Sequence, residues 1–182
     1  MLGSIYALIA LGYTMVYGIL RIINFAHGDI LMVGALTTLS GMHALNAHFP
    51  TLPPLAQLGL ALVLAMAVCA LLAMAVERFA YRRLRNAPRL APLISGIGVS
   101  VLLQTVAMIV WSRNPLMFPQ ILSMDAIAVT HGSAAHPPAL VTVTGIVTVA
   151  LAFAVMLGLW LLVEYTRLGR GMRAVAENPR IA

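Results

Sequence analysis

The stretch LAQLGLALVLAMAVCALLAMAV, residues 55–76, contains no charged side chain. A helix needs about 20 apolar residues to cross the roughly 30 Å of hydrocarbon in a bilayer. Ten residues of this stretch are Leu or Val. Each favours insertion by about 0.3–0.6 kcal/mol, so together they contribute roughly 3–6 kcal/mol. The stretch is therefore predicted to be a membrane-spanning helix.

Three further runs share this character: residues 1–20, 93–111 and 139–163 are also free of charge and of similar length. Residues 30–45 form a more polar run without formal charge, which we predict as the second membrane segment in chain order. Asp29 precedes it and is expected near a membrane face or in a polar cavity, because an acid at mid-bilayer costs about 2.5–3.5 kcal/mol. The predicted fold is all-α, a polytopic transmembrane helical bundle of about five membrane segments.

The composition of the whole chain agrees with a membrane protein. Of the 182 residues, 62% are hydrophobic and 9% are charged. An ordinary soluble domain is about 45–50% apolar and about 25% charged, and a globule of this size buries only roughly 70% of its unfolded surface. The composition therefore excludes a soluble enzyme, a disordered tail and a nucleic-acid-binding domain.

Arginine placement predicts the orientation in the membrane. All 11 basic residues are arginine, and most of them lie in the segments 77–92 and 164–182. Two predicted crossings separate these segments, so they share one face, which the positive-inside rule makes cytoplasmic. The loop 112–138 is then outward-facing, the N-terminus lies outside and residue 182 is cytoplasmic.

The sequence carries no motif for catalysis or metal binding. It has no lysine, so it cannot form the phosphate-binding loop GxxxxGK[ST], and it contains neither HExxH nor GxSxG. The single cysteine, Cys69, gives neither a disulfide framework nor a thiol metal site. We therefore predict no catalytic residue, no metal and no cofactor, and a protein that is not an enzyme.

Polar residues in and after the first segment are candidates for a translocation path. Tyr13 lies within that segment, and Asn24, His27 and Asp29 follow it. A helix break near Gly28 would free backbone groups beside them, and such breaks in membrane proteins usually border a cavity. These residues either line a permeation route or hinge, or they are ordinary packing and interface residues, and the pattern leaves both interpretations open.

Gln104 lies inside the run 93–111, where its amide requires a hydrogen-bond partner. In the same run, Gly96 and Ser100 have the spacing that lets helix backbones approach closely. Packing is the favoured interpretation of these residues, with pore lining as the alternative.

The segment 164–182 is predicted to contain a short amphipathic cytoplasmic helix. Leu168, Met172 and Val175 would share one face, with arginines around the other side. Such a helix can dock into a groove on a partner or lie on lipid headgroups, and the pattern alone leaves both open. The glycines at 169 and 171 argue against a simple surface anchor, since each costs about 1 kcal/mol in a helix interior.

Four stretches resemble the membrane permeases of branched-chain amino acid ABC importers. GSIYALIALGYTMVYGILRIINFAHGD, residues 3–29, resembles the opening of these permeases. Three later stretches agree with it: ERFAYRRLR at 77–85, LISGIGVSVLLQ at 93–104 and GRGMRAVAENP at 169–179. The resemblance covers nearly the whole chain.

The resemblance implies a multi-pass subunit of the cell inner membrane that forms the translocation path for leucine, isoleucine and valine. Its implied partners are a second related permease, two cytoplasmic ATPases that hydrolyse the ATP, and a periplasmic substrate-binding protein. Permeases of urea and short-chain amide importers share much of this signature, and an ATPase-independent channel or carrier is a further alternative.

The resemblance also bears on the roles of residues, because it implies that Asn24 and His27 lie where the transport movement matters. Together with the polar residues singled out from the pattern, the candidate translocation-path residues are Tyr13, Asn24, His27, Asp29 and Gln104. Residues 169–177 resemble the coupling segment that contacts the ATPases, which favours docking over headgroup binding. The candidate coupling residues are Gly169, Arg170, Met172, Arg173, Ala174 and Glu177. Family members usually continue through several more membrane helices, so residues 1–182 are expected to form a single, partial permease domain, the N-terminal part of a longer protein.

Overall fold

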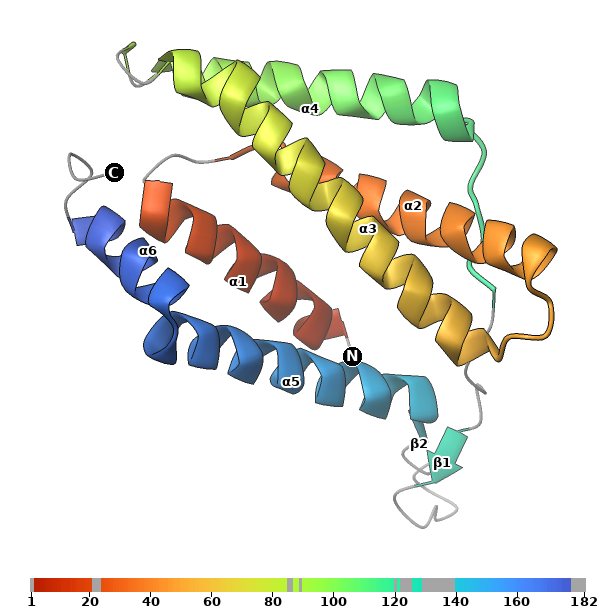
Figure 1. Ribbon diagram of the computed structural model, residues 1–182. Helices are drawn as coiled ribbons and strands as arrows, with labels where there is room; N and C mark the ends of the chain where they lie inside the picture. The colour runs from red at the N-terminus through yellow and green to blue at the C-terminus, as the bar shows by residue number, and fades with distance from the viewer. Residues whose placement is uncertain are drawn as a thin grey trace, which may run out of the picture. The chain divides into compact units, whose positions relative to one another are not determined.

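The computed structural model of the chain is dominated by helices (Figure 1). It describes residues 2–20, 24–84, 87–88, 90–119, 121, 126–128 and 140–177. In chain order, the α-helices among these residues are α1 (Leu2–Leu20), α2 (His27–His48), α3 (Pro54–Val76), α4 (Leu90–Trp111), α5 (Val143–Tyr165) and α6 (Arg167–Glu177).

Two short features accompany the α-helices. The α3 helix runs on into a π-helical turn, η1 (Glu77–Tyr81), and then a 3-10 turn, η2 (Arg82–Leu84). The predicted cytoplasmic loop 77–92 therefore begins as helix. A strand in the predicted outward loop, β1 (Ala126–Ala128), pairs antiparallel with β2 (Leu140–Thr142). The all-α prediction is confirmed, with this small ribbon as an addition to it.

Four of the described helices are long and apolar enough to cross a membrane, and Leu2–Gly18 is a shorter apolar helix. The four long helices are His27–His48, Pro54–Leu84, Leu90–Trp111 and Val143–Tyr165. The more polar segment predicted at 30–45 is thus a helix, extended at both ends.

The last predicted membrane segment begins later than expected, at 143 rather than 139. Strand β2 occupies the preceding residues, and Thr142 caps α5, because its Oγ1 accepts a hydrogen bond from the Gly145 backbone nitrogen at 3.2 Å. A threonine at this position satisfies one of the free N–H groups of the first helical turn. Residue 139 lies outside the described residues.

The chain divides into two compact units, each described by itself. One unit comprises Met1–Arg21 and Leu122–Ala182, with α1, α5, α6 and the ribbon. The other comprises Ile22–Ile121, with α2, α3 and α4. The single partial permease domain over 1–182 and the side of the membrane on which each end lies stay predictions.

Small residues allow α2 and α3 to approach closely in the second unit, where the two helices lie side by side (Figure 1). Ala61 is completely buried, and a Cβ added at Gly41 would lie 3.2 Å from the Ala61 Cβ. At Gly34 an added Cβ would lie 2.9 Å from the Cys69 Sγ. Close backbone approach through small residues is the usual way in which membrane helices associate.

Polar groups secure the ends of these helices. Gln57 is 6% exposed, and its Nε2 donates to the Leu52 carbonyl at 3.0 Å in the turn between α2 and α3. The Trp111 Nε1 donates to the Ser40 Oγ at 2.7 Å, joining the end of α4 to α2. The first bond satisfies a carbonyl of the turn that has no partner in a helix, and the second links two helices through their side chains.

The outer surfaces of both units are apolar. Ile109 on α4 is 78% exposed, Leu71 on α3 is 64% exposed and Phe153 on α5 is 62% exposed. Exposed apolar surface of this extent is unfavourable in water but matches the hydrocarbon of a bilayer.

Candidate functional site

The break before the second membrane helix lies at Asn24–Ala26, because α2 begins at His27 and Gly28 is inside its first turn. The Asn24 Oδ1 accepts a hydrogen bond from the Ala26 backbone nitrogen at 3.0 Å, and the Asn24 carbonyl accepts one from the His27 nitrogen at 3.2 Å. An asparagine that bonds to the backbone two residues ahead stabilises a tight turn. The predicted discontinuity is therefore present, slightly earlier than Gly28.

Three segments meet around the Tyr81 hydroxyl. The Tyr81 hydroxyl, from η1, donates to the Asn24 Oδ1 at 2.9 Å. On α4, a Cβ added at Gly96 would lie 2.9 Å from this hydroxyl oxygen and 3.6 Å from the Phe25 backbone nitrogen. Gly96 thus provides the close approach that its small-residue spacing predicts. Sequence reasoning missed Tyr81, and the only signal for it was the ERFAYRRLR stretch.

A second polar contact joins α2 to α4. The Gln104 Nε2 donates to the Asp29 Oδ1 at 2.9 Å and lies 3.3 Å from the Ser100 Oγ. Asp29 is only 8% exposed and lies in the first turn of α2, where the helix dipole favours a negative charge. The hydrogen-bond partner that Gln104 requires is thus a carboxylate 75 residues away in the sequence.

The structure gathers four of the five candidate path residues in one unit. Asn24, His27, Asp29 and Gln104 all belong to the unit of α2, α3 and α4. Together with Tyr81, these four residues form what we call the polar junction. Tyr13 belongs to α1 in the other unit. Within the residues that the structure describes, no three His, Cys, Asp or Glu side chains are grouped to hold a metal ion.

The predicted coupling segment forms α6, and Thr166 makes the corner that joins it to α5. The Thr166 nitrogen donates to the Leu162 carbonyl at 3.2 Å, which ends α5. The Thr166 Oγ1 accepts from the Gly169 nitrogen at 3.1 Å, which caps α6. Because α6 folds back on the last turn of α5, a Cβ added at Gly169 would overlap the Val163 carbonyl oxygen.

An ion pair also connects α6 to α5. The Arg173 Nη1 lies 3.0 Å from the Glu164 Oε2, and its Nη2 donates to the Glu164 backbone carbonyl at 3.2 Å. Both side chains are nearly half exposed, at 45% and 47%. The pair therefore contributes at most about 1 kcal/mol, and it adds a second connection between α6 and α5 beside the Thr166 corner.

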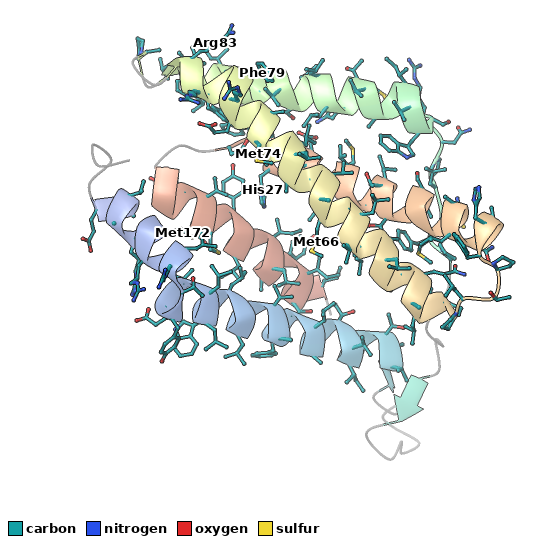
Figure 2. All side chains as sticks on the ribbon, viewed as in Figure 1. His27, Met66, Met74, Phe79, Arg83 and Met172 are labelled. Atoms are coloured by element: carbon teal, nitrogen blue, oxygen red, sulfur yellow. The ribbon has the colours of Figure 1, made fainter. Side chains whose placement is uncertain are left out.

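The six candidate coupling residues separate into two groups. Gly169 is buried and Met172, which Figure 2 labels on α6, is half-buried, so both face their own chain. The exposed candidates are Arg170, Arg173, Ala174 and Glu177. Leu168, expected on the same face as Met172, is instead 69% exposed. Residues 178–182 lie outside the described residues.

Comparison with known proteins gives one family for the entire chain. The model of the branched-chain amino acid transport system / permease component family matches residues 1–182. The chain is 38% identical over 176 residues to the high-affinity branched-chain amino acid transport system permease protein BraD of Pseudomonas aeruginosa, covering 97% of this chain and 56% of BraD. It is 37% identical over 182 residues to the permease protein LivH of Salmonella typhimurium, covering 100% of this chain and 58% of LivH.

A third relative, LivH of Escherichia coli K12, is 36% identical over 182 residues, covering 100% of this chain and 58% of LivH. The chain thus spans somewhat more than half the length of these curated relatives. No solved structure matches it.

Proposed function

The chain belongs to the branched-chain amino acid transport system permease family, and from this premise we propose that it forms part of the permease subunit of an ATP-driven importer of leucine, isoleucine and valine. Family membership and the four membrane-length helices make it a multi-pass protein of the inner membrane. The observation that carries the proposal is the family match over residues 1–182.

In this proposal the polar junction works as a hinge beside the path. It joins the start of α2, the end of α3 and the α4 helix through single hydrogen bonds, such as that from Tyr81 to Asn24 at 2.9 Å. A hydrogen bond of this kind contributes only about 0.5–1.5 kcal/mol, so it holds one arrangement without preventing another. Irregular backbone and buried polar groups within membrane helices occur where a cavity or a moving joint requires them.

The proposed partners follow from the same premise: a second related permease, two cytoplasmic ATPases and a periplasmic substrate-binding protein. The N-terminus would lie outside and residue 182 in the cytoplasm. We assign the contact with the ATPases to the exposed face of α6. A push on α6 would reach α5 through the Thr166 corner and the pair between Arg173 and Glu164.

Arg170→Glu is expected to reduce co-purification of the ATPase with the permease at least about tenfold, because a reversed charge in an interface costs several kcal/mol. Arg170 is the suitable position because it is exposed and its side chain has no partner within the described residues, whereas Arg173 is paired with Glu164. Arg113→Glu, an exposed arginine predicted on the outer side, is the matched control. Equal recovery of the ATPase with both variants would contradict the assignment to α6.

Transport itself is tested with the complete permease, assembled in proteoliposomes with its ATPases and its binding protein. Labelled leucine is expected to accumulate only when both ATP and the binding protein are present, and labelled urea is expected not to accumulate. Accumulation of urea without leucine would replace the proposal with a urea or amide importer. Leucine uptake without ATP would replace it with an independent carrier.

A further inference from the structure

The length of α3 predicts that the basic turns η1 and η2, which follow it, lie at the depth of the lipid headgroups. Helix α3 has 23 residues and is about 35 Å long, close to the roughly 30 Å of hydrocarbon in a bilayer. The helical chain continues from Pro54 to Leu84, 31 residues in all. The eight residues of η1 and η2 therefore extend about 12 Å beyond the end of α3, into the region where the phosphate groups of the lipids lie.

Four side chains at this end border an open hollow on the surface of the helix. Arg78, Phe79, Arg82 and Arg83 line a space of about 460 Å³ that is open to the outside. Figure 2 labels Phe79 and Arg83 at the same end of the helix. The spacing explains the grouping, because residues four apart on a helix are neighbours. The π-helical turn at Glu77–Tyr81 carries Arg78 and Phe79, and η2 carries the other two arginines.

The three arginines outnumber the one acid of their segment, Glu77, and none of them forms an ion pair within the described part of the chain. Within the described residues, the ion pair is the one between Arg173 and Glu164. None of the three arginines of the hollow lies within 4.0 Å of a described carboxylate oxygen. A guanidinium presents its N–H groups in a planar fork that matches the oxygens of a phosphate in pairs. The hollow is therefore suited to a phosphate-bearing anion.

The apolar surroundings favour a lipid as the source of that phosphate. Phe79 is 66% exposed beside the arginines, although water is an unfavourable surrounding for it. One turn and two turns back along α3, Met74 and Leu71 are 58% and 64% exposed, and Figure 2 shows Met74 on the same helix as Phe79. An acyl chain can run along this surface while its headgroup is held by the arginines, whereas a free phosphate ion would leave it uncovered.

We propose that Arg78, Arg82 and Arg83 bind the phosphate of an anionic phospholipid headgroup, and that Phe79 packs against the part of the acyl chain nearest to that headgroup. The site goes beyond the proposed transport function. It depends on the position of α3 in the bilayer and requires no transported substrate, so a failure of leucine uptake would leave it intact.

The test titrates the purified full chain in detergent with dioctanoyl phosphatidylglycerol and counts bound lipid by native mass spectrometry. Each basic residue near a membrane surface contributes a factor of about five to the affinity for anionic lipid. The triple variant Arg78→Gln, Arg82→Gln, Arg83→Gln is therefore expected to bind the lipid about 100-fold more weakly. Arg113→Gln removes one exposed arginine elsewhere and is expected to leave the affinity unchanged. Single Gln variants, each with a loss of about fivefold, serve if the triple variant does not fold.

Two further arms identify the ligand. Dioctanoyl phosphatidylcholine is expected to bind at least tenfold more weakly than dioctanoyl phosphatidylglycerol, because its positively charged choline group is repelled by the arginines. Inorganic phosphate is expected not to displace the bound lipid at equal concentration. Equal affinity for the two lipids, displacement by inorganic phosphate, or unchanged binding in the triple variant would each overturn the proposal. Unchanged lipid binding together with loss of ATPase co-purification in the triple variant would also overturn it, in favour of a protein partner at this surface.

Discussion

Gly169→Ala is expected to destabilise the corner between α5 and α6 by about 3 kcal/mol, the upper end of the cost of overpacking a close contact. The added Cβ would overlap the Val163 carbonyl oxygen and would also lie 2.5 Å from the Leu162 carbonyl oxygen. Both atoms belong to the backbone of α5, so they cannot move aside as a flexible side chain would. To accept the methyl group, α6 has to move away from α5.

The expected results are a lower unfolding temperature and a loss of ATP-driven uptake that exceeds the loss of ATPase binding. For a chain of 150–250 residues, about 3 kcal/mol corresponds to a fall of roughly 6–12 °C, measurable by thermal unfolding in detergent. Because α6 would move away from α5 while its exposed face stays unchanged, ATP-driven uptake should fall more than ATPase co-purification. Loss of co-purification with no change in unfolding temperature would contradict this explanation.

Gly171→Ala is the matched control, since it lies two residues away on the same helix. A Cβ added at Gly171 has no atom within 4 Å. Alanine is favoured over glycine in a helix interior by about 1 kcal/mol, so this variant is expected to be neutral or slightly more stable. If both variants were equally destabilised, the close contact at Gly169 would not be the cause.

The membrane segments were predictable from the sequence because insertion depends on local composition. Uncharged runs located the helices within a few residues, and α6 was predictable because its arginines and apolar residues alternate with the period of a helix. The start of α5 was wrong by four residues, since a strand and the Thr142 cap occupy the place of its first turn.

The partners within the polar junction were not predictable in this way. Helices α3, α4 and α5 are apolar on all sides, so the hydropathy pattern does not tell which face of α4 meets α2. The contact between Asp29 and Gln104 depends on that rotation, although the sequence did predict that Gln104 needs a partner. Tyr81 was missed because its segment was predicted as a loop, whereas the helical turn after α3 carries its hydroxyl to Asn24.

Gln104→Leu is expected to destabilise the unit of α2, α3 and α4 by about 3 kcal/mol, because it leaves the buried Asp29 carboxylate without the amide that donates to it at 2.9 Å. Thermal unfolding in detergent measures the loss. Thr105→Val is the matched control on the same helix. The Thr105 hydroxyl bonds only to the Val101 carbonyl within α4, so its removal should cost less than about 0.5 kcal/mol. Equal losses from the two variants would show that Gln104 does not satisfy Asp29.

The double variant Asp29→Leu, Gln104→Leu separates the two interpretations that the sequence left open for these residues. Gln104 is exposed and Asp29 is buried, so the cost of Gln104→Leu lies mainly in the unsatisfied Asp29 carboxylate. Replacing both partners of a hydrogen bond by apolar groups is nearly neutral, so the double variant is expected to recover most of the stability that Gln104→Leu loses. If the pair only packs α2 against α4, leucine uptake by the complete importer should recover with the stability. If the pair works in the hinge beside the path, as we propose, uptake should stay low in the stable double variant, because the polar contact that moves with the hinge is gone.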